Sequence, residues 1–152
     1  MKKTLLALLC AAQLFASDVQ KVIYDLSTSE LETIENRFIK GIVANKNHYE
    51  NQLQELDVRV IIHGGAYKFF VNDLSKTVFK EDKEAQKINN ELKARLKSLA
   101  TTYGVKFQMC QVGANSKKLT REDIASYVEM APNTTIALIN AQNDGYAYVP
   151  VR

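Results

Sequence analysis

The residue best suited to covalent chemistry in this sequence is Cys110, in the stretch KFQMCQVGANSKK. A cysteine reacts as the thiolate, and nearby positive charge or the start of a helix lowers the pKa of its thiol. Lys117, Lys118 and Arg121 follow closely, and Gly113 allows the intervening loop to fold back toward the sulfur. The pattern is therefore compatible with a reactive thiolate. It is equally compatible with a buried structural cysteine, because free cysteines are often buried and inert.

A second candidate, His63, stands at the end of an apolar run in the stretch VIIHGGAYKFF. Histidine is a common acid, base or ligand in binding sites. His63 and the adjacent Gly64 are therefore candidates to line the same crevice as Cys110. The alternative is a strand-end histidine whose ring is satisfied by the backbone. His48 lies in a polar stretch and is interpreted as a surface residue.

Other kinds of site find little support in the sequence. A zinc site needs about four ligands, whereas Cys110, His48 and His63 have unrelated spacings. The glycine pair after His63 lacks the spacing of phosphate-binding loops, and there is no C-x-x-C pair for dithiol redox chemistry. We therefore expect neither a metal nor a cofactor.

Apolar runs of strand length recur along the chain, and the elements between them show helical spacing. Ser29 and Glu32 have the spacing of a capping box, Gly104 is a typical helix stop, and Thr120 is a typical N-cap. Residues 66–80 fit neither pattern clearly. We predict strands over residues 22–26, 58–62, 105–109, 135–139 and 146–149, and helices over 29–42, over 88–103 and from 120 onward.

This alternation predicts one α/β domain with a mostly parallel five-stranded sheet and helices on both faces, of the flavodoxin-like class. Ligands of such sheets gather at the carboxyl ends of the strands, where His63 and Cys110 both fall. In the flavodoxin-like strand order 2-1-3-4-5, the first strand separates the strands that lead to these residues. The two strand ends would then be about 10 Å apart, so a direct pair within one subunit is not expected.

The first residues have the pattern of a secretory signal peptide: Lys2 and Lys3, an apolar run, and a small residue at Ala16. We expect cleavage after Ala16, a mature domain of residues 17–152 and a periplasmic location. A membrane-spanning helix needs about 20 apolar residues, and this run is shorter. The alternatives are a short membrane anchor and a lipoprotein signal at Cys10, which the bulky preceding residue disfavours. Cleavage would leave Cys110 without a partner for an intramolecular disulfide.

Charge and composition limit the possible partners. The formal net charge of +3 falls to +1 without Lys2 and Lys3. Such a balance does not indicate a polyanionic partner, and basic and aromatic residues are not interleaved as in single-strand binders. No later apolar run is long enough to cross a membrane. We expect no nucleic-acid partner and no stable membrane span.

Four stretches occur in a characteristic order: VRVIIHGGAYKFFV, YGVKFQMC, LTREDI and NDGYAYVPV. Together they resemble the exported single-domain members of the DsrE/DsrF-like sulfur-trafficking family. The resemblance implies an α/β sheet, assembly as a homo-oligomer, and a cysteine at the position of Cys110 that accepts sulfane sulfur as a persulfide. One departure is that Lys118-Leu119 stands where such members have a glycine and an apolar residue, so the binding loop differs.

We therefore predict a periplasmic sulfur-handling protein, acting as a persulfide carrier or sulfurtransferase through Cys110. His63, Gly64, Lys117 and Lys118 are the predicted substrate-binding residues. The expected partners are copies of the chain itself, with sulfur donors and acceptors that are proteins or small thiols. The apolar residues 67–71 are expected to help form the homo-oligomer. The alternative is a non-catalytic homo-oligomeric binding module of the same fold.

Overall fold

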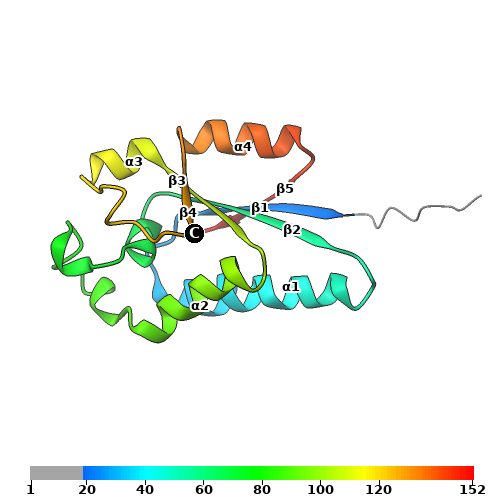
Figure 1. Ribbon diagram of the computed structural model, residues 1–152, viewed down its shortest axis with the longest axis horizontal. Coiled ribbons are helices and arrows are strands. Elements are labelled where there is room, and N and C mark those ends of the chain that lie inside the picture. The colour runs from blue at the N-terminus through cyan, green and yellow to red at the C-terminus, as the bar shows by residue number, and fades with distance from the viewer. Residues whose placement is uncertain (1–18) are drawn as a thin grey trace, which may run out of the picture.

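The computed structural model describes residues 19–152 and centres on a parallel β-sheet (Figure 1). The sheet has the strand order β4-β3-β2-β1-β5, and every neighbouring pair is parallel. The strands are β1 (Gln20–Leu26), β2 (Leu56–Ile62), β3 (Lys106–Cys110), β4 (Val128–Ala131) and β5 (Ala147–Val151). The predicted five-stranded parallel α/β sheet is confirmed. The predicted leader, residues 1–16, lies outside the described residues.

The strand order corrects the order 2-1-3-4-5 from which the separation of His63 and Cys110 was predicted. β2 lies between β1 and β3, so the strands that lead to His63 and Cys110 are direct neighbours. Their register pairs Ile62 with Met109. Ile62 immediately precedes His63, and Met109 immediately precedes Cys110. The predicted separation of about 10 Å between the two strand ends assumed an intervening strand, and no strand within residues 19–152 lies between β2 and β3.

One face of the sheet is covered by the π-helical turn η1 (Thr33–Ile39), helix α1 (Lys40–Glu50) and helix α2 (Asn90–Thr101), as Figure 1 shows. Their apolar residues recur at helical spacing and are at most 4% exposed: Ile34, Phe38, Ile39, Ile42, Leu92, Leu96 and Leu99. Full burial of such a side chain stabilises the fold by about 1.5–3 kcal/mol. The apolar residues whose spacing predicted these helices are thus the residues that the helices bury against the sheet.

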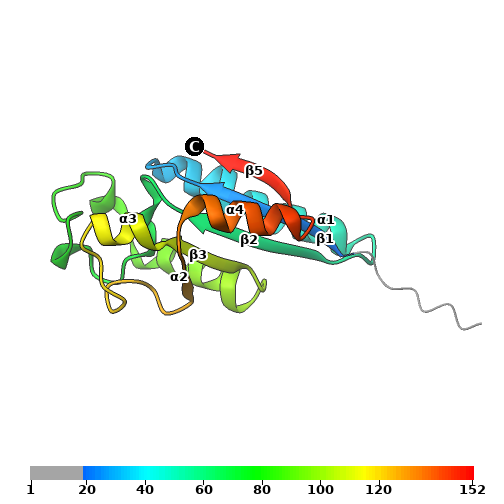
Figure 2. The same cartoon turned by 90° about the horizontal axis from the view of Figure 1, so that it is seen from above.

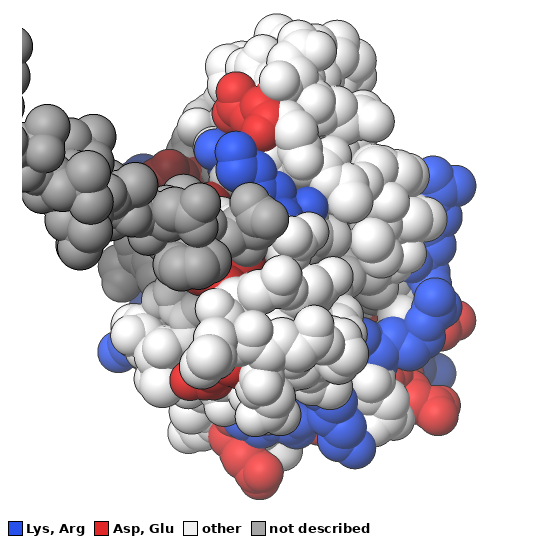
Figure 3. Space-filling model, turned by 90° about the vertical axis from the view of Figure 1, so that its right-hand side faces the viewer, with Lys and Arg blue, Asp and Glu red and all other residues white. Residues whose placement is uncertain are grey.

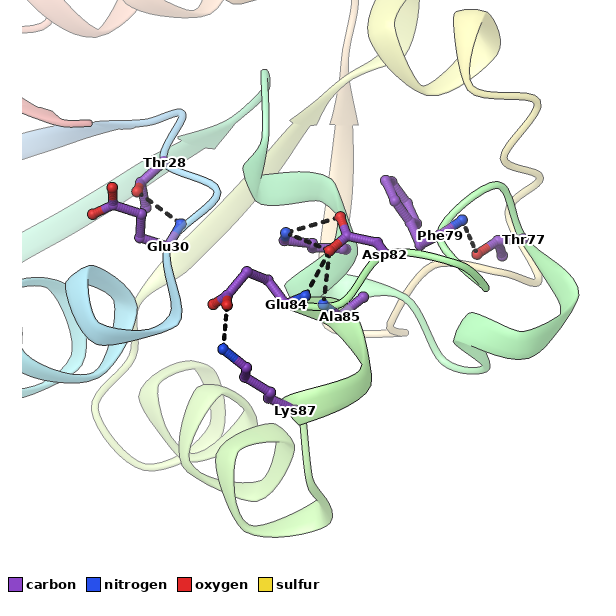
Figure 4. A network of polar contacts seen from close by, with 9 residues as sticks. Thr28, Glu30, Thr77, Phe79, Asp82, Glu84, Ala85 and Lys87 are labelled. Carbon is purple, nitrogen blue, oxygen red and sulfur yellow. Dashed lines mark hydrogen bonds and ion pairs between the residues drawn. The ribbon is translucent and has the colours of Figure 1, made fainter.

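The start of the first helical segment differs in detail from the prediction. Thr28 rather than Ser29 supplies the side-chain acceptor, for the N–H of Glu30 at 3.1 Å, and Glu30 in turn accepts from the Thr33 hydroxyl. Figure 4 shows the contact between Thr28 and Glu30. Helix α2 has the N-cap Asn89, whose side chain accepts from the N–H of Leu92 at 2.8 Å.

The other face is covered by helix α4 (Thr134–Asn143), which lies across the sheet in Figure 2. The predicted strand over residues 135–139 is wrong, because this segment belongs to α4. Asn133 caps the helix by accepting from the N–H of Ile136 at 2.8 Å. Ala137 and Ala141 pack against the sheet. A short apolar run cannot be assigned to strand or helix by periodicity alone, and the cap residue is the signal that was missed.

The fourth strand is instead the four-residue β4, for which the sequence carries little signal.

The helix predicted to begin at Thr120 is also wrong. Residues 120–123 form a turn, in which both the N–H and the hydroxyl of Thr120 donate to Asp123, at 2.8 and 2.9 Å. The short helix α3 (Gln111–Ser116) lies before this turn and directly follows β3.

Residues 63–89 connect β2 to α2 through three 3-10 turns, η2 (Ala66–Phe70), η3 (Leu74–Lys76) and η4 (Ala85–Lys87). The connection is held by Lys68, which is 3% exposed and donates to both carboxylate oxygens of Asp82, at 3.1 and 2.9 Å. Asp82 also accepts from the N–H groups of Glu84 and Ala85 (Figure 4).

The apolar stretch of residues 67–71 is core and not surface. Tyr67, Phe69, Phe70 and Val71 are at most 2% exposed. The expectation that this stretch contacts another subunit is therefore wrong, because its side chains are already buried within the chain.

The outer surface mixes both signs of charge. Figure 3 views the end of the molecule where α1 leads into β2, and there basic and acidic groups alternate among uncharged ones. Some of these charges pair between strands, such as Lys106 with Asp57 at 3.2 Å. Within residues 19–152, no helix combines the length and the apolar character that a membrane span requires.

Candidate functional site

Cys110 is the last residue of β3 and the residue from which α3 starts. It is 7% exposed, and its strand partner is Ala131 at the end of β4. Helix α4 begins three residues after Ala131, at Thr134. The thiol therefore lies where two helices start at the carboxyl edge of the sheet.

The thiol is surrounded by hydrogen-bond donors. Burial by itself raises the pKa of the Cys110 thiol, but hydrogen bonds outweigh this effect and the pKa is lowered. The donors are the N–H of Gly113, the hydroxyl and the N–H of Thr134, and the hydroxyl of Tyr67. A thiolate at this position is thus stabilised by aligned dipoles in a nearly enclosed site.

Tyr67 connects the thiol to the long connection after β2. Its hydroxyl donates to the backbone oxygen of Cys110 at 3.0 Å. Burial raises the pKa of Tyr67, and the hydrogen bond to Cys110 and the charge of Cys110 raise it further. Tyr67 therefore stays a proton donor throughout the range in which the thiol ionises.

His63 is held by a carboxylate and not by the backbone. Its Nε2 lies 2.5 Å from Oδ1 of Asp25, a residue of β1 that is 4% exposed. The other oxygen of Asp25 accepts from the Tyr148 hydroxyl at 2.7 Å, and the Arg152 guanidinium lies 4.0 Å away. The His63 side chain is 29% exposed. The carboxyl edge of the sheet thus carries an oriented Asp–His pair next to the strand of Cys110.

A sequence model of the DsrE/DsrF-like family matches residues 21–151. The chain belongs to the DsrE/DsrF-like family. The resemblance predicted from the four sequence stretches is confirmed, and membership of this family suggests a function of the sulfur-relay type.

Individual proteins are similar to this chain in sequence or in fold. An uncharacterized protein of Aquifex aeolicus (strain VF5) is 30% identical over 150 residues, which cover 99% of this chain and 64% of that relative's length. Two solved structures share the fold. MTH1491 of Methanobacterium thermoautotrophicum has a TM-score of 0.61 at 15% identity, over 86% of this chain and 98% of that one. The ychN protein of E. coli has a TM-score of 0.58 at 16% identity, over 87% and 98%.

In this DsrE/DsrF-like chain, the two predicted lysines lie at the end of α3. The ammonium group of Lys117 lies 5.6 Å from the ring centres of both Tyr67 and Phe79. Lys118 is exposed and has a positive φ of 55°. The main groups that lower the pKa of the Cys110 thiol are hydrogen-bond donors. The roles of Lys117 and Lys118 in binding a substrate stay a prediction.

Gly64 has a structural reason to be glycine. Its φ is +58°, and a Cβ there would lie 3.0 Å from the backbone oxygen of Ser27. At Gly65, a Cβ would lie 2.6 Å from the Cβ of Ser29. The glycine pair thus lets the segment after β2 pass against the segment after β1. A role of Gly64 in substrate binding stays a prediction.

Four residues of the site were not singled out from the sequence: Asp25, Tyr67, Thr134 and Tyr148. Asp25 did leave a signal, because it is a carboxylate within the otherwise uncharged run of residues 22–26. Thr134 lies in a segment that was assigned to a strand, so its place at a helix start was hidden. Among the residues that the structure describes, no group of three or more His, Cys, Asp or Glu side chains is arranged to hold a metal ion.

Proposed function

We propose that the protein is a sulfur carrier in which Cys110 takes up one sulfane sulfur and passes it to an acceptor thiol. The observation that carries the proposal is the position of Cys110, which ends β3 at the carboxyl edge of the sheet and lies beside the starts of α3 and α4. Hydrogen bonds from Gly113, Thr134 and Tyr67 lower the pKa of its thiol there, although burial opposes this. The same donors suit a persulfide anion, which places its charge close to the position of the thiolate. Family membership supports sulfur as the cargo.

The chemistry needs no external oxidant or reductant. The Cys110 thiolate attacks the outer sulfur of a donor persulfide RS–SH, the donor S–S bond breaks, and RS⁻ leaves with the electron pair. The new Cys110–S–SH group is then attacked at its outer sulfur by an acceptor thiolate, and this restores the Cys110 thiolate. One cysteine without a resolving partner is sufficient for both steps. The same two steps would make the protein a sulfurtransferase, rather than a carrier, if it binds a specific donor and a specific acceptor itself.

The test is uptake of sulfur from inorganic polysulfide. Mass spectrometry of the treated protein should show one added sulfur atom on the peptide that contains Cys110, and a thiol reductant should remove it. Cys110→Ser should stay folded and take up none. Native protein that gains no sulfur would contradict the proposal.

A second candidate is a binding module in which Cys110 takes no part in chemistry. The observation in its favour is that Cys110 is only 7% exposed. Alkylation separates the two functions, because a reactive thiolate is alkylated in the native protein, whereas a structural thiol stays protected until the chain unfolds.

We further propose that the mature protein is periplasmic and forms a homo-oligomer. The signal-peptide pattern of residues 1–16 supports export. Assembly is supported by Ile136 and Ile139, which are 41% and 51% exposed on the outer side of α4. Exposed apolar side chains that lie together are typical of subunit contacts. Sulfur donors and acceptors would approach as proteins or small thiols.

A further inference from the structure

The Asp25–His63 pair is a second chemical feature of the carboxyl edge, and the hydrogen bonds around the Cys110 sulfur do not involve it. Asp25 is 4% exposed, and its carboxylate binds the His63 ring and the Tyr148 hydroxyl. An ionised carboxylate can only accept hydrogen bonds. We assign the proton of this contact to Nε2 of His63, with Asp25 accepting it, and the contact holds the ring in one orientation.

The other ring nitrogen of His63 is available for a ligand. Among residues 19–152, the only side-chain hydrogen bond of His63 is the one to Asp25, so Nδ1 has no protein partner there. The side chain is 29% exposed, which leaves it reachable from solvent. An oriented imidazole with one free nitrogen is the usual form of a proton-transferring histidine.

The strand register places His63 and Cys110 at the ends of two neighbouring strands. Ile62 and Met109 are partners on β2 and β3, and both point into the core under α1 and α2. His63 directly follows β2 and Cys110 is the last residue of β3, and neighbouring strands lie about 4.8 Å apart. Ala131, the strand partner of Cys110, packs against α4, and His63 and Cys110 border the same carboxyl edge of the sheet.

We propose that His63, oriented by Asp25, is the proton donor and acceptor for the thiols that exchange sulfur with Cys110. This inference rests on the proposed sulfur transfer. When Cys110 attacks a donor persulfide, the donor S–S bond breaks and the departing thiolate RS⁻ takes a proton from the His63 imidazolium. The neutral His63 then removes the proton of the acceptor thiol, whose thiolate attacks the Cys110 persulfide. His63 is thereby recharged, and no proton is left over after one cycle.

Asp25 acts through His63 and is a positioning residue. Its negative charge stabilises the imidazolium and fixes which nitrogen carries the proton. Tyr148 holds the other oxygen of Asp25 in place. Asp25→Asn would keep the shape of the side chain but remove the charge and favour the wrong ring tautomer.

The experiment compares two donors on the full chain in single-turnover reactions with Cys110. One donor is the persulfide of an alkyl thiol, whose leaving group needs a proton near neutral pH. The other is an aryl disulfide with electron-withdrawing substituents, whose leaving thiolate departs without one. Removing a general acid slows the first reaction but not the second. A merely structural change would slow both.

We expect His63→Gln to slow sulfur uptake from the alkyl persulfide by about 100-fold. The reaction with the aryl disulfide should change by less than about threefold. Asp25→Asn should slow the first reaction by at least about tenfold. His48→Gln is the matched control, because His48 is an exposed histidine of α1 whose ring forms a hydrogen bond with Gln52, and it should leave both rates unchanged.

Equal slowing of both reactions in His63→Gln, or no slowing of the first, would overturn the inference. Asp25 is buried, so the rates of Asp25→Asn count only when the variant is folded. His63→Gln alters a partly exposed side chain, and its two rates alone decide whether His63 transfers the proton. Failure of the proposed function looks different. In that case the wild-type protein itself takes up no sulfur from the alkyl persulfide, and both proposals fall together.

Discussion

Gly113 and Tyr67 approach each other so closely that no larger residue fits at position 113. A Cβ on Gly113 would lie 1.9 Å from the Tyr67 hydroxyl oxygen, well inside contact distance. Both residues donate a hydrogen bond to the Cys110 thiol. The first turn of α3 and the connection after β2 are thus fitted to each other around the sulfur.

Gly113→Ala should disturb both the packing and the thiol. Tyr67 is 1% exposed and cannot move freely, so we expect a loss of about 1–3 kcal/mol in the free energy of unfolding, the usual range for overpacking. The pKa of the Cys110 thiol should rise, because its donors are displaced. Urea unfolding and the pH dependence of alkylation by iodoacetamide measure the two effects.

Gly41→Ala is the control for this substitution. Gly41 lies in α1, and a Cβ there meets nothing within 4 Å. Alanine in a helix is favoured over glycine by about 0.5–1 kcal/mol, so this variant should be slightly stabilised and keep the thiol pKa. If both variants behave alike, the close contact with Tyr67 is not the cause.

Thr134→Val tests the contribution of α4 to the thiol. The variant removes the hydroxyl donor and keeps the N–H and the shape of the side chain. A hydrogen bond to a charged group contributes about 1.5–3 kcal/mol, so its loss should raise the thiol pKa. Alkylation at a pH below the thiol pKa should slow by about tenfold or more.

The neighbouring Thr135→Val is the matched control, because Thr135 is an exposed threonine in the same helical turn. Its thiol pKa should stay at the wild-type value. An unchanged pKa in Thr134→Val would mean that the N–H groups alone stabilise the thiolate.

Asp82→Asn should destabilise the connection between β2 and α2. It leaves the ammonium group of Lys68, which is 3% exposed, without its charged partner. Breaking a fully buried ion pair on one side costs about 3–5 kcal/mol; the Asp82 side chain is 34% exposed, so solvent screening should reduce the loss to about 1–3 kcal/mol. The double variant Lys68→Met and Asp82→Asn should recover part of this loss, since no buried charge remains. The exposed pair of Lys76 and Asp73 is the control, and Asp73→Asn should change stability by less than about 1 kcal/mol.

The effect of Asp82→Asn should depend on pH. Burial opposes ionisation of Asp82, but the bond to Lys68 and the N–H groups of Ala85 and Glu84 hold its pKa below the usual value. A carboxyl whose pKa is lowered in the folded state stabilises the fold above its unfolded pKa of about 3.9. This stabilisation is lost as the pH falls through the folded pKa. Urea midpoints of the wild type and Asp82→Asn should therefore converge in acid.

Much of the fold could be predicted from local patterns. β1, β2, β3 and the core faces of η1, α1 and α2 follow from apolar spacing, and the end of β3 placed Cys110 at the carboxyl edge. α4 was mistaken for a strand because its first residues, Thr134 to Ile139, are β-branched or apolar and show no polar face. β4 was missed because four residues are too few to show the alternation of apolar and polar side chains that identifies a strand.

The composition of the site could not be predicted from the sequence in the same way. The donors Tyr67 and Thr134 lie 43 residues before and 24 residues after Cys110 in the numbering, and the strand order decides which elements meet. The sequence fits the order 2-1-3-4-5 as well as the observed one, because every crossover is long enough for either. Consequently only the structure could show that β2 and β3 are adjacent strands, and that His63 and Cys110 therefore lie at neighbouring strand ends.

Export predicts a shortened chain. Intact-mass analysis of protein isolated from its native host should give the mass expected after cleavage following Ala16, and the protein should be found in the periplasmic fraction. A full-length chain in the cytosol would contradict the proposed location. A lipid-modified chain beginning at Cys10 would support the lipoprotein alternative instead.

Assembly predicts that α4 contributes to contacts between subunits. Ile136 and Ile139 are exposed on this helix, while the apolar residues 67–71 are buried and unavailable. Light scattering of the wild type should give at least twice the monomer mass, and Ile139→Lys should lower it, since a lysine at a subunit contact would bury an unpaired charge. Val78→Lys is the control, because Val78 is 56% exposed but lies in the connection before α2, far along the chain from α4. A wild type that is monomeric at micromolar concentration, or an Ile139→Lys variant with the wild-type mass, would contradict this role of α4.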